Sequence, residues 1–155
     1  MKQMLTFFLL SIFGSVSLHG QTPDLVALAK VRTAVLVIHA TTSISCGDGS
    51  EGTCVRNDSD VITKVKSIVD GTEIWQQFGK AEATKADAIF EFTVTNATTT
   101  YARVEFSVRD ADSNKILYGE VRSIVLLEND ITRIIVHFLK VVEEAKNKPL
   151  NTKKH

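Results

Sequence analysis

The residues from Asp130 to Lys146 carry the strongest periodic pattern in this sequence and constrain its fold most. Apolar side chains recur there every three or four residues, which is the spacing of one face of an α-helix. They are Ile131, Ile134, Ile135, Phe138, Val142 and Ala145. A stripe this wide needs an apolar surface to cover it, so we expect this helix to pack into the core. We expect the helix to begin at a cap on Asn129 or Asp130. The alternative is an amphipathic face left free for a membrane or a partner.

The covering surface is expected to be a β-sheet. Ala34 to Ile38 is a continuous apolar run without alternation, which predicts a central strand buried on both faces. Ala88 to Thr95 predicts a second strand. Arg103 to Val108 alternates apolar and polar residues, and the turn residues Asp110 to Asn114 separate it from Ile116 to Leu126, so these two segments predict a hairpin.

The remaining segments predict one more helix and several connections. Asp58 or Ser59 caps a helix with an apolar stripe that ends at Gly71. Thr22 and Pro23 are suited to the N-cap and first position of a short helix. Thr41 to Asn57 is polar and glycine-rich, which predicts a long loop, and Glu73 to Phe78 predicts a short edge strand carrying Trp75.

This order of elements predicts an α/β (α+β-like) fold. We expect a single mixed sheet of about four or five strands, with the two main helices packed on one face. The sequence shows no internal repeat and no linker between domains.

The N-terminus has the three-part layout of a secretory signal peptide. Lys2 provides a positive charge, Leu5 to Val16 is apolar, and small residues follow up to Gly20. The apolar stretch is too short to span a bilayer, and no other stretch is long enough. We therefore expect a signal peptide over residues 1–20, one globular domain over 21–146 and a basic flexible tail over 147–155. The mature chain would begin between Leu18 and Gln21 in the periplasm or outside the cell.

Charge and composition exclude some partners. The chain has 18 basic and 18 acidic residues, so no overall field of one sign attracts nucleic acid. A hydrophobic content of 44% suits an ordinary globular domain.

Cys46 and Cys54 lie in the polar loop, on either side of its glycine-rich segment. In an oxidising compartment a pair at this spacing predicts a disulfide, worth about 2.5 kcal/mol in the chain-entropy model. A two-cysteine metal site or a redox pair are the alternatives. The metal site would need further ligands, of which only His39 is near in sequence, and the redox pair would favour the C-x-x-C spacing, which is absent.

The same loop contains Gly47-Asp48-Gly49-Ser50-Glu51-Gly52, a literal G-x-G-x-x-G. It does not follow a strand directly, and Asp48 and Glu51 would repel a phosphate, so we expect no nucleotide cofactor. The acidic groups do not have the spacing of a calcium-binding EF-hand loop, and we expect no metal site.

Neither His39 nor Trp75 predicts a catalytic site. His39 follows the apolar strand, but no nucleophile or metal motif accompanies it, so we expect no enzyme and no catalytic residues. Trp75 is expected to pack in the core, with a partner contact as the alternative. The residues that remain candidates for a partner or ligand contact are His39, Asp48, Glu51 and Trp75.

Two short stretches resemble a known bacterial module. Lys85 to Phe90 is similar to an Ala-Asp entry into a sheet strand, and Val108 to Tyr118 is similar to a hairpin with Asn114 in place of the usual glycine. Together they resemble the small α/β module of the TolB N-terminus and of CsgG-type envelope proteins. The resemblance implies a non-enzymatic accessory role in the bacterial envelope, and it supplies no catalytic residues.

The sequence thus predicts an exported, non-catalytic envelope protein that binds or assembles with another macromolecule, whose identity and stoichiometry remain open. A binder of a small molecule or metal ion that uses the Cys46–Cys54 loop is the alternative. Convergent charges in a deep pocket would favour that alternative, whereas a partly apolar surface or an open sheet edge would favour assembly.

Overall fold

The computed structural model describes residues 22–45, 53–95, 102–124 and 127–147. For residues 42–45, 53–57, 124 and 127 it describes the backbone alone. The elements, in chain order, are α1 (Leu25–Leu28), β1 (Thr33–Ser45), β2 (Thr53–Asn57), α2 (Ser59–Asp70), α3 (Ile74–Gln77), β3 (Gly79–Lys80), β4 (Ala88–Thr95), β5 (Ala102–Asp110), β6 (Ile116–Ile124) and α4 (Leu127–Asn147).

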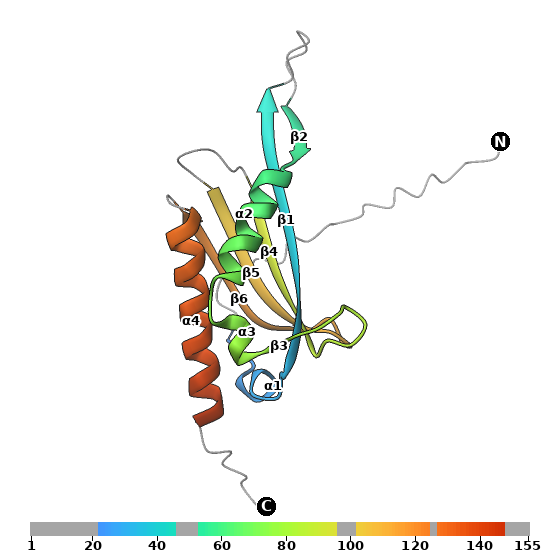
Figure 1. The fold of residues 1–155 in the computed structure, drawn as a ribbon, viewed down its shortest axis with the longest axis vertical. Helices are drawn as coiled ribbons and strands as arrows, with labels where there is room; N and C mark the ends of the chain where they lie inside the picture. Colours follow the sequence, from blue (N-terminus) through green and yellow to red (C-terminus); the bar gives the residue numbers. More distant parts are fainter. Residues whose placement is uncertain (1–21, 46–52, 96–101, 125–126, 148–155) are drawn as a thin grey trace, which may run out of the picture.

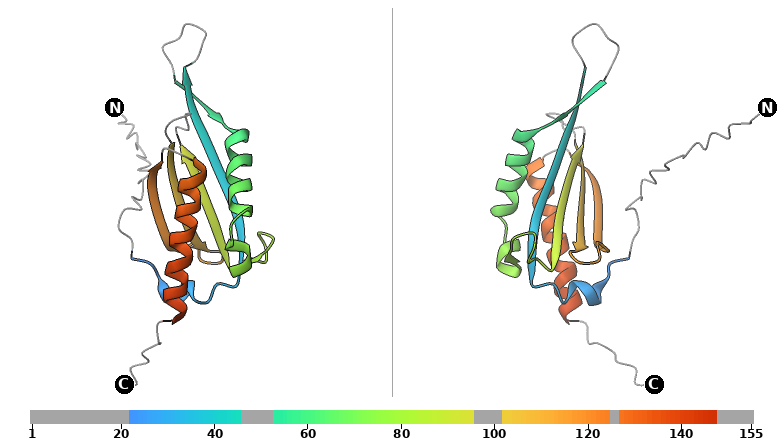
Figure 2. Two further views of the ribbon diagram at one scale, coloured as in Figure 1. Left: turned by 60° about the vertical axis from the view of Figure 1, so that its left-hand side comes forward. Right: turned by 90° about the vertical axis from the view of Figure 1, so that its right-hand side faces the viewer.

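The strands form one mixed sheet, in the order β2-β1-β4-β5-β6, with the short β3 beside the beginning of β1. β1 runs parallel to β4 and β3, and the other neighbouring pairs are antiparallel. The two long helices, α2 and α4, lie side by side on one face of this sheet (Figures 1 and 2). This arrangement confirms the predicted α/β class, with its single mixed sheet and two main helices on one face.

The core lies between these helices and the sheet. The predicted stripe of α4 is buried there, with Ile131, Ile134, Ile135, Phe138 and Val142 fully inaccessible and Ala145 8% exposed. The facing strands contribute alternate residues, among them Phe90, Phe92 and Phe106. The prediction that α4 belongs to the core is therefore confirmed. The helix begins at Leu127, so Asn129 and Asp130 lie within its first turn, and the predicted caps at these residues are wrong.

Side chains at the ends of elements explain several boundaries. Asp58 caps α2 by accepting a hydrogen bond from Val61 N at 3.1 Å, and Gly71 ends the helix, as predicted. The cap of α1 is Asp24, whose carboxylate accepts from Ala27 N, and Thr22 is not the N-cap. In the β5–β6 turn, Asn114 adopts the left-handed conformation at φ 56°, which asparagine tolerates well.

Two segments differ from the sequence prediction. Residues 74–77 form the helix α3, where an edge strand was expected, because burying Ile74 beneath the end of α2 favours a turn of helix. The predicted loop from Thr41 to Asn57 instead holds the end of β1 and all of β2, which pair as an antiparallel hairpin. Threonine, serine and isoleucine are abundant over Thr41 to Ser45, and such residues sustain a strand without clear alternation.

No helix in the described part of the chain combines the length and the apolar character needed to cross a membrane.

Candidate interaction surface

The face of the sheet opposite α2 and α4 carries no helix within the described residues (Figure 2). We call this surface the open face. Alternation along the strands and the pairing register place the following side chains on it: Val35, Val37 and His39 of β1; Ile89, Glu91, Thr93 and Thr95 of β4; Arg103, Glu105, Ser107 and Arg109 of β5; Gly119, Val121 and Ser123 of β6. β1 is therefore not buried on both faces as predicted, because Val35 and Val37 point to this side and remain partly accessible.

A polar cluster lies at the centre of the open face, and it includes the predicted candidate His39. The carboxylate of Glu91 on β4 accepts a hydrogen bond from Arg109 Nε at 2.8 Å and another from Ser107 Oγ at 3.3 Å. Its other oxygen lies 3.4 Å from His39 Nε2 on β1. Glu91 thus connects three neighbouring strands. Ser107, its neighbour across the β4–β5 pair on the same face, is the buried polar residue of the described chain.

The geometry of this cluster argues against acyl-transfer chemistry. In a catalytic triad the histidine stands between the nucleophile and the acid, so that it can remove the proton of the nucleophile. Here the carboxylate of Glu91 stands between Ser107 and His39, so the serine hydroxyl donates to the carboxylate and not to the imidazole. The cluster is suited to holding strands together and to presenting charge on the open face.

A second polar cluster joins α4 to the edge strand β6. Tyr118 donates its hydroxyl hydrogen to Glu120 Oε2 at 2.7 Å, and the hydroxyl oxygen lies 3.0 Å from His137 Nδ1. His137 Nδ1 is 3.1 Å from Glu120, whose other oxygen accepts from Arg122. Burial raises the pKa of Tyr118. Burial by itself would also raise the pKa of Glu120, but its hydrogen bonds with Tyr118, His137 and Arg122 lower that pKa below the usual value.

Sequence reasoning missed this second cluster, because His137 lies outside the apolar stripe of α4 and carries no local signal of a partner. A signal was present in β6. Glu120 and Arg122 stand at alternate positions with the buried Tyr118, on the side of the strand that faces the core. Charged residues at inward positions need partners, so this pattern would have indicated a hydrogen-bonded cluster.

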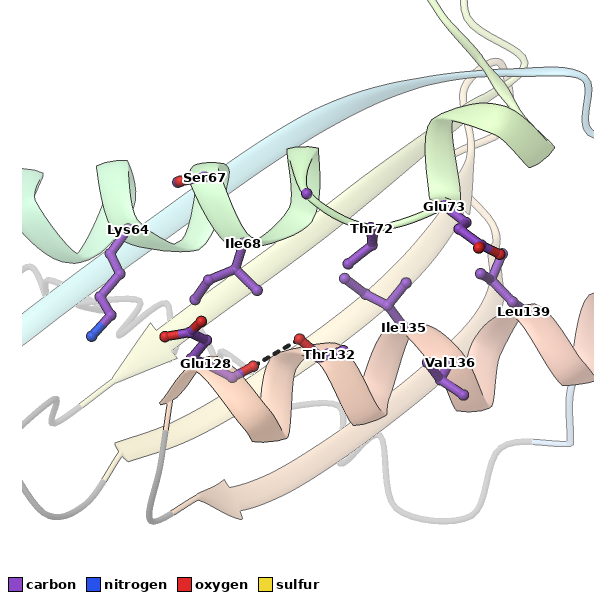
Figure 3. Close-up of a pocket in the computed structure, with 11 residues that line it drawn as sticks. Lys64, Ser67, Ile68, Thr72, Glu73, Glu128, Thr132, Ile135, Val136 and Leu139 are labelled. Carbon is purple, nitrogen blue, oxygen red and sulfur yellow. Dashed lines mark hydrogen bonds between the residues drawn. The ribbon is translucent and has the colours of Figure 1, made fainter.

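A groove with a volume of 680 Å³ runs between α2 and α4 (Figure 3). Its apolar lining comes from Ile68 on α2 and from Ile135, Val136 and Leu139 on α4. Lys64 and Glu128 extend from the two helices at one end of the groove, where their opposite charges compensate each other. Glu73 lines the groove as well, so the groove presents charges of both signs to a ligand.

The other predicted site residues have different positions. Trp75 packs partly buried against Phe90, and its Nε1 donates to Asp70 at 2.8 Å, so the expected core role is confirmed. Asp48 and Glu51 lie outside the described residues, as does Cys46. Only the backbone of Cys54 is described, where it pairs with Ile44, and no disulfide is shown. The Cys46–Cys54 bond and the ligand-binding alternative that uses this loop therefore stay predictions.

Comparison with solved structures shows a likeness of fold. PelC from Paraburkholderia phytofirmans, solved as a dodecamer, superposes with a TM-score of 0.50 at 12% identity, covering 78% of this chain and 93% of PelC. XCC0632 from Xanthomonas campestris, of the DUF330 family, gives a TM-score of 0.47 at 8% identity, covering 76% of this chain and 89% of that one. No protein-family model and no curated protein sequence matches this chain.

PelC belongs to a different family from the TolB N-terminal and CsgG-type modules, so the resemblance suggested by the sequence is wrong. The two stretches that suggested it perform local tasks that many folds require. Asp87 accepts hydrogen bonds from the backbone N–H groups of Arg32 and Thr33, each at 2.9 Å, and so aligns the beginnings of β1 and β4. The stretch around Asn114 forms a hairpin turn. Neither feature specifies a family.

Proposed function

We propose that this chain is an exported, non-catalytic accessory protein that works by assembling with another macromolecule, in the first instance with further copies of itself. The observation that carries the proposal is the one-sided sheet. Both long helices pack on one face, and the open face remains accessible in the described structure.

The chemistry of the open face suits a protein contact. Val35, Val37, Ile89 and Val121 provide partly exposed apolar area, and the charged residues among them are already paired within the molecule. Pre-paired charges can enter an interface without leaving an unpartnered buried ion, so only the desolvation of the pair opposes their burial. The likeness to PelC, which crystallised as a dodecamer, supports self-association as the first form of assembly to test.

Export rests on the pattern of residues 1–20. Placement in a bacterial envelope was implied only by the mistaken resemblance, so the proposal is limited to an exported protein.

The experiment is sedimentation velocity on the mature chain, purified from secreted or periplasmic material and measured over a series of concentrations. The proposal expects a species larger than one chain whose proportion rises with concentration, as mass action requires. A single chain at every concentration would contradict self-assembly.

A further inference from the structure

The charged side chains that the strands place on the open face balance one another at neutral pH. Glu91 and Glu105 provide the carboxylates, and Arg103 and Arg109 provide the guanidinium groups. His39 is the further ionisable side chain on this face. A histidine gains its proton between about pH 8 and pH 5, while carboxylates and guanidinium groups keep their charges. The described residues of the open face therefore carry no net charge with His39 neutral and a positive net charge with His39 protonated.

Both carboxylates are already bonded to an arginine. Glu91 accepts a hydrogen bond from Arg109 Nε at 2.8 Å. Glu105 accepts from Nε and Nη2 of Arg103 at 3.2 and 3.0 Å. Glu91 also lies 3.4 Å from His39 Nε2, so a protonated His39 shares this carboxylate with Arg109. The cluster around Glu91 then holds two positive charges against one negative charge.

The other described groups around His39 do not offset this charge on the open face. On β4 its partner in the register is Thr93, which is uncharged. Asp58 donates its backbone N–H to Ala40 O at 3.0 Å, but its carboxylate caps α2, which packs on the opposite face of the sheet. β2, which pairs with β1 from Thr41 onward, is described by its backbone alone. In a single chain the imidazole is 58% exposed, so water stabilises its charge.

The accessible apolar side chains of the open face adjoin His39. Val35 and Val37 precede it on the same side of β1, and Ile89 lies beside Val35 on β4. Sheets that present such residues pack face to face about 10 Å apart. A two-fold contact uses the same patch on both copies, so packing of open face on open face needs no second surface on the molecule. Such a contact removes water from the His39 of both copies.

We propose that two copies pack open face against open face, and that protonation of His39 separates them. This inference rests on the proposed self-assembly, and it names the contact and its regulation. With His39 neutral, each face enters the contact with its charges balanced. With His39 protonated, each copy buries a positive charge while the carboxylates of both faces are already bonded to Arg103 and Arg109. Burial of an unbalanced charge is costly, so protons bind preferentially to the separate chains and association weakens as pH falls.

Sedimentation velocity on the mature chain at two pH values tests the regulation. Measurements at about pH 7.5 and about pH 5.5 span the range in which histidine titrates and stay above the range of the carboxylates. The dissociation constant is expected to be about tenfold or more higher at the lower pH, because each contact covers two copies of His39. Urea melts at both pH values establish that the chains are folded.

Substitutions assign the effect to His39. His39→Gln cannot take up a proton, so the ratio of its two dissociation constants should fall to about one. His39→Lys carries its charge at both pH values, so it should associate as weakly at the higher pH as the parent does at the lower. The matched control is His137→Gln, which removes a histidine on the helical side of the sheet, and it should keep the pH dependence of the parent.

Cross-linking tests the contact itself. A photo-reactive amino acid replaces Thr93, whose partly accessible side chain lies on the open face beside His39 and Glu105. Isotopically heavy and light chains are mixed before irradiation, so that cross-links between copies can be recognised by mass spectrometry. The expected products join position 93 of one copy to β1, β4 or β5 of another at the higher pH, and their yield should fall at the lower pH.

The outcomes separate the two proposals. A chain that is monomeric at every concentration and at both pH values overturns the self-assembly and this inference together. The inference alone fails, and self-assembly stands, if His39→Gln keeps the pH dependence of the parent or the parent associates equally at both pH values. Cross-links from position 93 to α2 or α4 of another copy, or a His39→Gln chain that does not associate at the higher pH, also overturn it.

Discussion

Phe138 gives the most direct test of the structural reasoning, because its ring is the centre of an aromatic cluster. Its centroid lies 5.2 Å from Tyr118, 5.3 Å from Phe106, 5.5 Å from Phe90 and 5.8 Å from Phe78, and the side chain is fully buried. Truncation of a buried phenylalanine to alanine costs about 3–5 kcal/mol. We expect the cost of Phe138→Ala in free energy of unfolding to lie in the upper half of that range, because four surrounding rings cannot collapse into the cavity without breaking their own contacts.

The control is Val136→Ala, two residues away on the same helix. Val136 is 46% exposed, so its truncation is expected to change the free energy of unfolding by no more than about 0.5 kcal/mol. Urea denaturation of both variants beside the parent chain provides the comparison. Because the whole domain is stable by only about 5–15 kcal/mol, Phe138→Ala should show a clearly lower midpoint or no folded state at all. Equal midpoints for the two variants would refute the placement of α4 against the sheet.

Three further predictions follow from the same structure. Glu120→Gln should lower the free energy of unfolding by about 1–3 kcal/mol at neutral pH. It should also flatten the loss of stability below about pH 5, because a carboxyl with a lowered folded pKa stabilises the fold above its unfolded pKa and loses that effect as pH falls through the folded value. Urea midpoints across pH measure both effects, and parallel curves for the variant and the parent would contradict the prediction. Asp87→Ala should cost about 1–2 kcal/mol, since it leaves the Arg32 and Thr33 N–H groups without their acceptor, and hydrogen exchange should be faster at the beginning of β1 than at its middle. Intact-mass analysis of secreted chain should place the mature N-terminus between Leu18 and Gln21, and a retained Met1 would refute export through a cleaved signal.

The parts of the fold that follow from local periodicity were predictable. The stripe on α4 and the alternation over Arg103 to Val108 both depend on burial of one side of a regular element, and burial leaves its period in the sequence. The cap at Asp58 and the stop at Gly71 were predictable for a similar reason, because the unpaired groups at a helix end require particular residue types. The segment Ile74–Gln77 was not, since four residues are too few for any period to distinguish a helical turn from a short strand.

The candidate site was less predictable because its residues meet across strands. His39 was identified as a candidate, but its partner Glu91 lies on β4 and carries no local signal, since a glutamate in the middle of an alternating strand is an ordinary outward residue. Their meeting depends on the parallel pairing of β1 with β4, which places His39 beside Thr93 and one position beyond Glu91 on the same face. Nothing in the spacing of 39 and 91 along the chain specifies that register.

β1 extends further than the sequence predicted. The sequence predicted a strand over Ala34 to Ile38, because the continuous apolar run ends there. β1 instead continues through the buried Ala40 to Ser45, and its backbone pairs first with β4 and then with β2 alone. Backbone pairing is independent of side-chain pattern, which explains why the extension was missed.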